Sequence, residues 1–591
     1  MCGIVGYLGK KRPANFLIKK LRKLEYRGYD SGGFTEFDND EFVTIKSVGS
    51  INNLDKKVDE NVCVSCAISH TRWATHGKPS EKNAHPQISK NSQWAVVHNG
   101  IIENYKELMT EQKFNLSSET DTAVIAEMLE RENVKTIEKF IDVFNKLDGS
   151  FGVVAICKNL PQTLFLAKKK SPLYVAKNQD GEWLVASDPV CFNGFSNEYY
   201  SLNDNEYAII NGSRVDFYNS NKHVLQKVVI GLDGILEQDN KGDYPHFMIK
   251  EIYEQPKVLK DQVEFYLNTG LLKKYDIEFF KRFEQVVFIG CGTAYHAGLV
   301  GARFIEKILN MPARAEMASE FISKKPFLLN KNCLCIFISQ SGETADTISA
   351  FELVKNRSIT SVCVTNVLYS TLAKKCDYVL PVCAGREIAV ASTKAYICML
   401  GSIYMFAMHL NNLKNNIQID FYKELKQVAD KLFDFDEQKI TSIAERIKNT
   451  AECFFIGKDL DYITAVESAL KLKEVTYINA NAYPSGELKH GYLALVSDKT
   501  NLIVIASDES TRLKTINSAN EAKARGAYDI IVTTDKRCLD KENAIVIREC
   551  DSIFAPMLAI VPMQLLAYKV SVLKNINPDM PRNLAKSVTV E

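Results

Sequence analysis

The chain has 591 residues, of which 46% are apolar and 25% are charged, an ordinary composition for a folded protein that excludes a largely disordered one. Its 73 basic and 72 acidic side chains leave a formal net charge of +1, which excludes a general electrostatic attraction to nucleic acid or to an anionic membrane surface. The longest uncharged apolar stretches, residues 395–410 and 555–568, are shorter than the roughly 20 residues that span a bilayer, so no membrane-spanning segment is predicted.

Short strand-like runs, separated by Gly and Asn, fill the first part of the chain to about residue 230. Examples are GSFGVVAICK at 149–158 and TLFLAKKKSPLYVAK at 163–177. Runs of this length predict stacked sheets with few helices. The polar, Gly-containing stretch GLDGILEQDNKGDYP at 231–245 then predicts a linker between domains.

Beyond this stretch, apolar strands alternate with longer helical patterns. VVFIG at 286–290 precedes a helical pattern, CLCIFIS at 333–339 precedes a loop and another helix, and SVCVTN at 361–366 follows. This alternation is typical of a doubly wound parallel sheet.

The alternating pattern occurs twice. Gly290 and Gly457, which end two similar strands, are 167 positions apart, and so are Ile338 and Ile505. A shared register over several strands indicates a tandem duplication. The sequence therefore predicts an N-terminal domain at 2–230, a linker at 231–245, a first α/β domain at 246–430 and a second at 431–591.

The N-terminus carries a candidate nucleophile. Removal of Met1 would leave Cys2 with a thiol and a free α-amine, which has an ordinary pKa of roughly 7.7–8 and can act as general base to its own side chain. Gly3 permits close approach of a substrate.

Three further motifs supply the groups that hydrolysis of an amino acid amide would need. Arg72 is suited to a carboxylate, Asn99 and the Gly100 N–H are candidate oxyanion donors, and Asp121 is a candidate partner for an ammonium group. Together they describe hydrolysis of glutamine. Read singly, each residue could instead be a solvated loop charge or an ordinary Asn-Gly turn.

A zinc site is a second interpretation of part of this region. Cys63 and Cys66 have a spacing known from zinc ligands, and His70 and His76 follow. However, 62–70 reads VCVSCAISH, an apolar run without the tight turn that would bring the ligands together. A buried strand and no metal site are therefore predicted.

The loop SQSGET at 339–344 follows an apolar strand and opens a helix, so it fits a phosphate group. The alternative is a well-capped helix start. In the second copy, ASDEST at 506–511 places Asp508 and Glu509 where Ser341 and Gly342 stand in the first, and carboxylates there would repel a phosphate. One sugar-phosphate site per chain, in the first copy, is predicted.

The second copy carries candidate catalytic groups instead. Lys471 and Glu474 lie three positions apart on a predicted helix, and therefore on one face of it, and His490 follows in a loop. By spacing alone, the first two could equally be a surface ion pair, and His490 could be a polar loop residue.

Six motifs of the N-terminal domain resemble the glutaminase domain of class II glutamine amidotransferases: CGIVGYLG, LEYRGYDSGG, HTRWATHG, NAHP, HNGIIENY and SETDT. The C-terminal half, to the closing PRNLAKSVTVE, resembles the sugar isomerase domains of one family among them, the glutamine–fructose-6-phosphate transaminases (isomerising), or glucosamine-6-phosphate synthases. The resemblance implies an αββα sandwich of the N-terminal nucleophile hydrolase class, followed by two doubly wound α/β sugar isomerase domains.

The resemblance also implies a role for each candidate residue. In the glutaminase domain, Cys2 would attack the carboxamide and Asn99 and Gly100 would hold the oxyanion; Arg72, Trp73, Thr75, His76 and Asp121 would bind glutamine, with Trp73 gating ammonia passage. In the isomerase half, the implied catalytic residues are Glu474, which moves a proton between C1 and C2, His490, which helps to open the ring, the Schiff-base residue Lys586, and Lys471. The implied sugar-phosphate residues are Cys291, Gly292, Thr293, Ser339, Gln340, Ser341, Thr344, Val390, Ala391 and Ser392.

The implied reaction converts D-fructose 6-phosphate and L-glutamine to D-glucosamine 6-phosphate and L-glutamate, the first committed step of hexosamine and UDP-N-acetylglucosamine synthesis. It implies no metal or organic cofactor, because an imine supplies the electron sink, and a homodimer. Fifteen cysteines, several in apolar runs, and an N-terminus without a secretory signal favour a reducing cytoplasm.

Two other classes of function stay open. One is another class II amidotransferase, such as the phosphoribosylamine-forming type, although the paired-carboxylate loop that it needs is not found in the sequence. The other is a non-catalytic sugar-phosphate sensor, which would need neither the complete set around Cys2 nor an intact Lys586 tail.

Overall fold

The computed structural model describes residues 2–59, 61–116, 118–232, 240–324 and 329–589. The chain divides into two compact units, an N-terminal unit up to residue 238 and a C-terminal unit from residue 239 to Lys586. Residues 233–239 of the predicted linker lie outside the described part of the chain.

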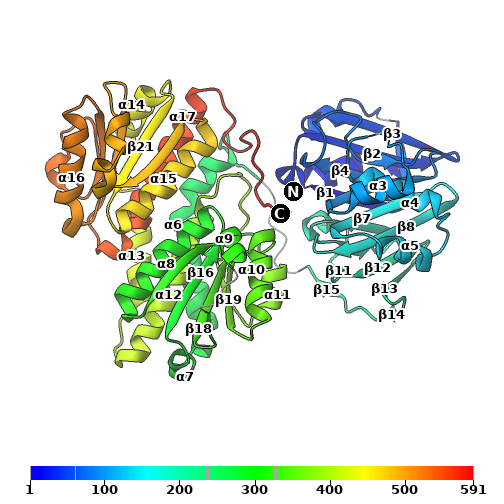
Figure 1. Ribbon diagram of the computed structural model, residues 1–591, viewed down its shortest axis with the longest axis horizontal. Helices are drawn as coiled ribbons and strands as arrows, with labels where there is room; N and C mark the ends of the chain where they lie inside the picture. The colour runs from blue at the N-terminus through cyan, green and yellow to red at the C-terminus, as the bar shows by residue number, and fades with distance from the viewer. Residues whose placement is uncertain (1, 60, 117, 233–239, 325–328, 590–591) are drawn as a thin grey trace. The chain divides into compact units, whose positions relative to one another are not determined.

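Two antiparallel sheets form the N-terminal unit (Figure 1). The first has the order β15 (Ile230–Gly231), β11 (Glu198–Ser201), β9 (Tyr174–Lys177), β10 (Trp183–Ala186), β1 (Gly3–Pro13), β4 (Cys63–Arg72), β2 (Ser31–Asp38) and β3 (Glu41–Val48). The second has the order β14 (Val224–Leu225), β13 (Arg214–Asn219), β12 (Glu206–Asn211), β8 (Leu160–Lys169), β7 (Gly149–Cys157), β6 (Trp94–Ile102) and β5 (Gln87–Ile88). The helices are α1 (Asn15–Arg22), α2 (Ile51–Asp55), α3 (Tyr105–Gln112), α4 (Thr122–Arg131) and α5 (Ile137–Phe144).

Alternation along the strands explains how these elements stack. On β1, Val5 and Tyr7 belong to the buried cluster that includes α1, whereas Ile4 and Leu8 belong to the cluster shared with the second sheet. The outer face of the second sheet packs against α4 and α5. Because side chains on a strand point to opposite faces in turn, three apolar cores separate four layers. The predicted αββα sandwich is confirmed.

Two five-stranded parallel sheets form the C-terminal unit. The first has the order β17 (Ala313–Met317), β16 (Gln285–Gly290), β18 (Cys333–Ile338), β19 (Thr360–Thr365) and β20 (Tyr378–Pro381), and the second the order β22 (Asn479–Pro484), β21 (Glu452–Gly457), β23 (Asn501–Ala506), β24 (Tyr528–Thr533) and β25 (Ala544–Val546). The identical strand order confirms the predicted duplication.

Helices cover both faces of the first of these sheets, as a doubly wound fold requires. On β16, Val286 and Phe288 pack in the cluster that includes α8 and α12, and Val287 and Ile289 pack in the cluster that includes α9 and α10. The helices of the unit are α6 (Phe247–Thr269), α7 (Ile277–Lys281), α8 (Thr293–Leu309), α9 (Ala318–Lys324), α10 (Ala345–Lys355), α11 (Thr371–Lys375), α12 (Lys394–Asn415), α13 (Phe421–Lys431), α14 (Glu437–Ile447), α15 (Leu460–Thr476), α16 (Glu509–Lys523) and α17 (Ala555–Leu573).

One helical segment, Ser552–Leu573, is long and apolar enough to cross a membrane by length and composition alone, with a mean hydropathy of 1.6. It passes this test because the helix continues beyond the uncharged run 555–568, through Lys569. However, 89% of its most apolar window is buried inside the protein, and its side chains join the largest core cluster of the unit. Such burial is typical of a core helix.

Candidate active sites

Cys2 lies immediately before β1, where the loop after β4 and the strand β6 reach it. The backbone N–H of Trp73 donates to Cys2 Sγ at 3.2 Å, and Asn99 Nδ2 donates to the Cys2 carbonyl at 2.9 Å. Burial raises the pKa of the Cys2 thiol, so the thiol needs a base before it can attack a substrate.

Asn99 and Gly100 lie on β6 opposite Gly152 and Phe151 of β7. Gly100 has a φ of +139°, and a Cβ there would lie 2.0 Å from the carbonyl oxygen of Ser150. Only glycine fits this position, because any larger residue would collide with the neighbouring strand.

Arg72 ends β4 and is held by the loop that follows it. Its Nη2 donates to the carbonyl of His76 and, at 3.1 Å, to that of Gly77. Its Nη1 is buried and, within the described residues, has no hydrogen-bond partner. A buried donor without a partner is costly, so this nitrogen is suited to an anionic ligand such as a carboxylate.

The other predicted glutamine-binding residues make hydrogen bonds with their own neighbours. Asp121 Oδ2 accepts a hydrogen bond from the N–H of Ile102 at 2.8 Å, while Thr75 is exposed and its Oγ1 lies 3.3 Å from His76 Nδ1. Burial lowers the pKa of Arg72, and the charges of Cys2, Asp30 and Asp121 oppose that shift. Asp121 is therefore close enough to Arg72 for its charge to raise the pKa of the guanidinium.

The strand interpretation of residues 62–70 is confirmed, since Cys63, Cys66 and His70 all lie on β4. Over the residues that the structure describes, no group of three or more His, Cys, Asp or Glu side chains is placed to hold a metal ion.

The predicted phosphate loop joins β18 to α10. Ser339 Oγ lies 2.9 Å from Thr344 Oγ1 and accepts the N–H of Gly342 at 3.0 Å. Gly342 has a φ of +65°, and a Cβ there would lie 2.0 Å from Ser370 Oγ. The loop thus folds tightly on itself around a position that only glycine fits.

The corresponding loop of the second copy has a different use. Asp508 caps α16 by accepting the N–H of Ser510 at 2.9 Å, and the N–H of Ser507 donates to Asp461 at 2.9 Å. Two carboxylates of the chain itself therefore occupy this loop. In the first copy, by contrast, Thr344 makes no side-chain cap to α10.

Lys471 and Glu474 form an ion pair in which the lysine is buried and the glutamate is 19% exposed. Lys471 Nζ lies 2.6 Å from Glu474 Oε2 and donates to Thr293 Oγ1 at 3.0 Å, and its side chain is 0% exposed. Although burial alone would lower the pKa of Lys471, the carboxylates of Glu467 and Glu474 outweigh it and raise that pKa. The surface ion-pair interpretation is wrong because the side chain of Lys471 is buried and bonded to Thr293, the first residue of α8.

Lys586 is enclosed by the segment before α12. Its Nζ donates to Glu387, which is 0% exposed in its side chain and also accepts Ser392 Oγ at 2.8 Å and the N–H of Thr393 at 2.9 Å. Lys586 and the backbone N–H groups of Ala395 and Thr393 outweigh the effect of burial and lower the pKa of Glu387. A charged pair therefore holds the lysine in place.

The remaining sugar-site candidates make contacts with other parts of the C-terminal unit. Cys291 Sγ is 3.7 Å from Thr347 Oγ1, Gly292 has a φ of +54° at the start of α8, and the N–H of Val390 donates to the Asp579 carbonyl at 3.0 Å. Ala391 is buried beside Val390. Gln340 accepts the N–H of Asn366 at 3.1 Å through its backbone carbonyl.

His490 stands apart from the other candidates. It is exposed between two short 3₁₀ helices, Ser485–Lys489 and Tyr492–Leu495, and its ring has no hydrogen-bond partner in the described part of the chain. The ring of Tyr492 stacks on Tyr483 at 3.7 Å and anchors the loop on β22. No described contact joins His490 to Lys471, Glu474 or Lys586.

Two buried glutamates were not found from the sequence. Glu387 holds Lys586, and Glu467 accepts hydrogen bonds from Thr293 Oγ1 at 3.1 Å and His296 Nδ1 at 2.6 Å. The spacing of four between Glu467 and Lys471 was the available signal, since such residues share a helix face.

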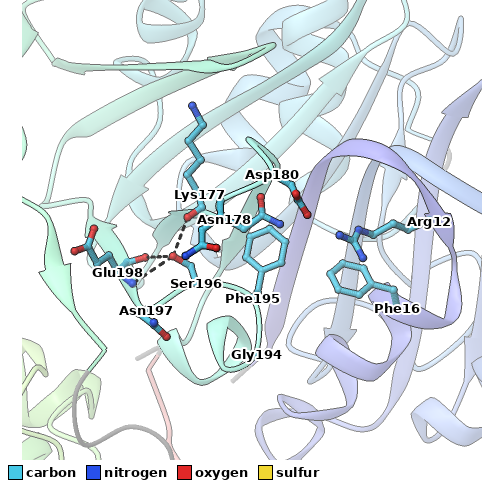
Figure 2. A pocket seen from close by; sticks show the side chains of 11 residues that line it. Arg12, Phe16, Lys177, Asn178, Asp180, Gly194, Phe195, Ser196, Asn197 and Glu198 are labelled. Atoms are coloured by element: carbon cyan, nitrogen blue, oxygen red, sulfur yellow. Dashed lines mark hydrogen bonds between the residues drawn. The ribbon is translucent and has the colours of Figure 1, made fainter.

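A groove of about 670 Å³ in the N-terminal unit contains none of the candidate residues (Figure 2). Its lining includes Arg12, Phe16, Lys177, Asp180 and Phe195, with Ser196 Oγ bonded to the carbonyls of Lys177 and Glu198. The groove therefore adds nothing to the site around Cys2.

Known proteins resemble the chain over its whole length. The family profile of the SIS domain matches residues 279–409 and 447–574, and that of the glutamine amidotransferase domain matches residues 70–193. The glutamine--fructose-6-phosphate aminotransferases [isomerizing] of Clostridium tetani and Bacillus subtilis are each 40% identical to it, over 611 and 605 residues, with both chains fully covered.

A solved structure agrees with these matches. The C-terminal domain of glucosamine-fructose-6-phosphate aminotransferase from Francisella tularensis is 34% identical, with a TM-score of 0.55, and matches 58% of this chain and all of its own length. With full-length relatives at 40% identity, this chain belongs to the family of the isomerizing glutamine–fructose-6-phosphate aminotransferases.

Proposed function

We propose that this protein is an enzyme that converts D-fructose 6-phosphate and L-glutamine to D-glucosamine 6-phosphate and L-glutamate. The observation that carries the proposal is the presence of both reaction centres in one chain: Cys2 beside Asn99, and Lys586 buried against Glu387. A non-catalytic sensor would need neither the complete set of residues around Cys2 nor an intact Lys586 tail.

In the first half-reaction, Cys2 Sγ attacks the carboxamide carbon of glutamine, and the α-amine freed by removal of Met1 accepts the thiol proton. Asn99 Nδ2 and the Gly100 N–H hold the oxyanion. Ammonia leaves, and water then hydrolyses the thioester to glutamate. Arg72 binds the substrate carboxylate and Asp121 its ammonium group, Thr75 and His76 also hold the amino acid end, and Trp73 gates ammonia passage. The unpartnered Arg72 Nη1 supports the role of Arg72.

In the second half-reaction, Lys586 Nζ forms a Schiff base with C2 of the open ketose, and ammonia replaces the lysine. Glu474 removes a proton from C1 and returns one to C2, assisted by Lys471, which lies 2.6 Å away. His490 assists ring opening. The phosphate and hydroxyl groups are bound by Ser339, Gln340, Ser341 and Thr344, with Cys291, Gly292, Thr293, Val390, Ala391 and Ser392 around the sugar.

We further propose a homodimer without a nucleic-acid or membrane partner, acting in the cytoplasm without a cofactor. The dimer and the absence of a cofactor rest on the family resemblance alone. The balanced charge supports the absence of a nucleic-acid or membrane partner, and the fifteen unpaired cysteines support the cytoplasm. The proposed domain boundaries are 2–230, 231–245, 246–430 and 431–591, and the SIS matches at 279–409 and 447–574 fall within the last two.

Replacement of the nucleophile tests the proposal. Cys2→Ala is expected to abolish glutamine hydrolysis and to leave the interconversion of fructose and glucose 6-phosphates intact, because that step uses only the C-terminal unit. Cys63→Ala, a change at another partly exposed cysteine of the same unit, is the matched control and is expected to leave both activities unchanged. Hydrolysis by the Cys2→Ala variant would show that the nucleophile is misassigned.

Substitution in the phosphate loop tests the second site. Ser341→Asp copies the acidic loop of the second copy and is expected to abolish binding of fructose 6-phosphate by charge repulsion. Ser510→Asp makes the same change in the second copy and is expected to leave affinity unchanged. Calorimetry with unaltered affinity for Ser341→Asp would mean that the phosphate binds elsewhere.

A further inference from the structure

His70 of β4 contacts the proposed oxyanion donor Asn99 of β6, and the two strands belong to opposite sheets of the N-terminal unit. The ring of His70 is 0% exposed. Its Nε2 lies 3.0 Å from Asn99 Oδ1 and 3.0 Å from the carbonyl oxygen of His98. A carbonyl only accepts hydrogen bonds, so Nε2 must carry a proton.

The proton on His70 Nε2 decides how Asn99 is oriented. Because Nε2 carries a proton, the Asn99 atom beside it must be an acceptor, so Asn99 turns its oxygen toward His70 and its NH2 group toward Cys2, whose carbonyl accepts Nδ2 at 2.9 Å. With the amide reversed, two donors would meet at His70 and no donor would face the nucleophile.

The surroundings keep His70 neutral and fixed. Burial lowers the pKa of His70 to about 3, and the charge of nearby Arg72 acts in the same direction. Its Nδ1 is buried without a partner in the described residues, as suits an unprotonated nitrogen. The ring of His85 packs against it at 4.3 Å between centroids.

We propose that His70 is a positioning residue for glutamine hydrolysis, which orients the Asn99 amide so that its NH2 group can hold the oxyanion formed at Cys2. This inference rests on the proposed role of Asn99.

Two substitutions place an amide donor at the positions of the two different ring nitrogens of His70. His70→Gln keeps an amide NH2 near the position of Nε2, whereas His70→Asn keeps one only near Nδ1, too far from Asn99. We expect kcat for glutamine hydrolysis to fall about 10- to 100-fold in His70→Asn and less than about 5-fold in His70→Gln, with KM changed less than about 3-fold in both. The rate of Cys2 alkylation by iodoacetamide and the sugar-phosphate isomerisation are expected to stay unchanged.

A double-mutant cycle separates this inference from the proposed function. If His70 acts through Asn99, His70→Asn adds little to the loss already caused by Asn99→Ala. Two outcomes would overturn the positioning role alone. One is that the fold-losses in kcat of the two single variants multiply in the double variant; the other is that His70→Asn keeps full kcat while Asn99→Ala loses it. Full kcat in Asn99→Ala would overturn the oxyanion assignment, and this inference with it.

A measurement on the unaltered protein covers the case in which His70→Asn does not fold. Nitrogen-15 NMR of histidine-labelled protein, with the His70 signal identified by its loss in His70→Gln, is expected to show the neutral ring protonated at Nε2 from pH 7.5 to pH 5. A ring protonated at Nδ1 would contradict the proposal, because Nε2 would then have no proton to donate.

Discussion

Gly342 takes a left-handed φ of +65°, and a Cβ at this position would lie 2.0 Å from Ser370 Oγ. Its own N–H donates to Ser339 Oγ, and its carbonyl accepts the N–H of Leu372 at 3.2 Å. One residue therefore ties the proposed phosphate loop to α11, which Ser370 caps. Because the clash involves a side chain that itself caps a helix, neither partner can move without cost.

We expect Gly342→Ala to weaken binding of fructose 6-phosphate by at least about 10-fold, because the loop must shift to admit the methyl group. Gly270→Ala is the control: its φ is +59°, but the nearest atoms belong to the flexible side chain of Lys273, so only the backbone cost of about 1 kcal/mol applies. Calorimetric titration distinguishes the two. Equal affinities in both variants would contradict the tight packing of the loop.

A second residue-scale expectation concerns His85. Burial lowers its pKa well below the ordinary value of 6.5. The unfolded chain binds a proton there below that pH and the folded chain does not, so stability is full above pH 6.5 and falls as the pH drops. The slope is up to about 1.4 kcal/mol per pH unit for each such histidine.

Urea unfolding followed by tryptophan fluorescence can measure this slope, since Trp73, Trp94 and Trp183, the three tryptophans of the chain, lie in the N-terminal unit. We expect the urea concentration at the unfolding midpoint to decrease as the pH is lowered from 7.5 to 5, and to decrease less in His85→Gln. His223→Gln, at an exposed position, should match the parent protein. Identical slopes in all three proteins would argue against a neutral, buried His85.

At the scale of elements, α8 and α15 are joined by a buried polar cluster. Glu467 of α15 is 0% exposed and accepts hydrogen bonds from Thr293 and His296 of α8, and Lys471 lies 3.5 Å from it. Each helix follows the first strand of one copy of the duplicated fold, β16 before α8 and β21 before α15. A carboxylate at their contact therefore links the two copies and also neutralises Lys471.

We expect Glu467→Ala to lower the stability of the C-terminal unit by about 3–5 kcal/mol, because a buried lysine loses one of its two carboxylates. Glu467→Gln, which keeps an acceptor, should cost less. Glu445→Ala removes an exposed pair with Lys448 and should cost at most about 1 kcal/mol. Differential scanning calorimetry ranks the stabilities of the three variants. If Glu467→Ala loses no more stability than Glu445→Ala, the cluster contributes little to the stability of the unit.

At the scale of the whole molecule, the chemistry is divided between two units with separate cores. The clusters of the N-terminal sandwich and those of the isomerase sheets share no residues. The relative from Francisella tularensis is described as a C-terminal domain and matches 58% of this chain, which is consistent with a second unit that folds by itself.

A fragment of residues 240–591 is therefore expected to interconvert fructose and glucose 6-phosphates with a KM within about 3-fold of that of the full chain, and to make no glucosamine 6-phosphate from glutamine. Lys586→Arg in the same fragment should abolish isomerisation, because the guanidinium cannot form the Schiff base. A soluble fragment without isomerase activity would show that the N-terminal unit completes the sugar site.

Much of this organisation could be predicted from the sequence, because it depends on patterns within short segments of the chain. The strand runs, the offset of 167 that reveals the duplication, the acidic loop at Asp508 and the family motifs each lie within short segments. Hydrophobic periodicity and turn residues record such features directly.

Only the tertiary structure decided which polar residues meet. Glu387 and Lys586 are 199 positions apart, and His70 and Asn99 are 29 apart on different sheets. Nothing in the sequence distinguishes Lys471 from a surface lysine, but in the fold its side chain is buried and bonded to Thr293 of α8. Contacts of this kind depend on strand order and helix packing, which bring distant segments together and remove their side chains from water, and no local pattern contains that information.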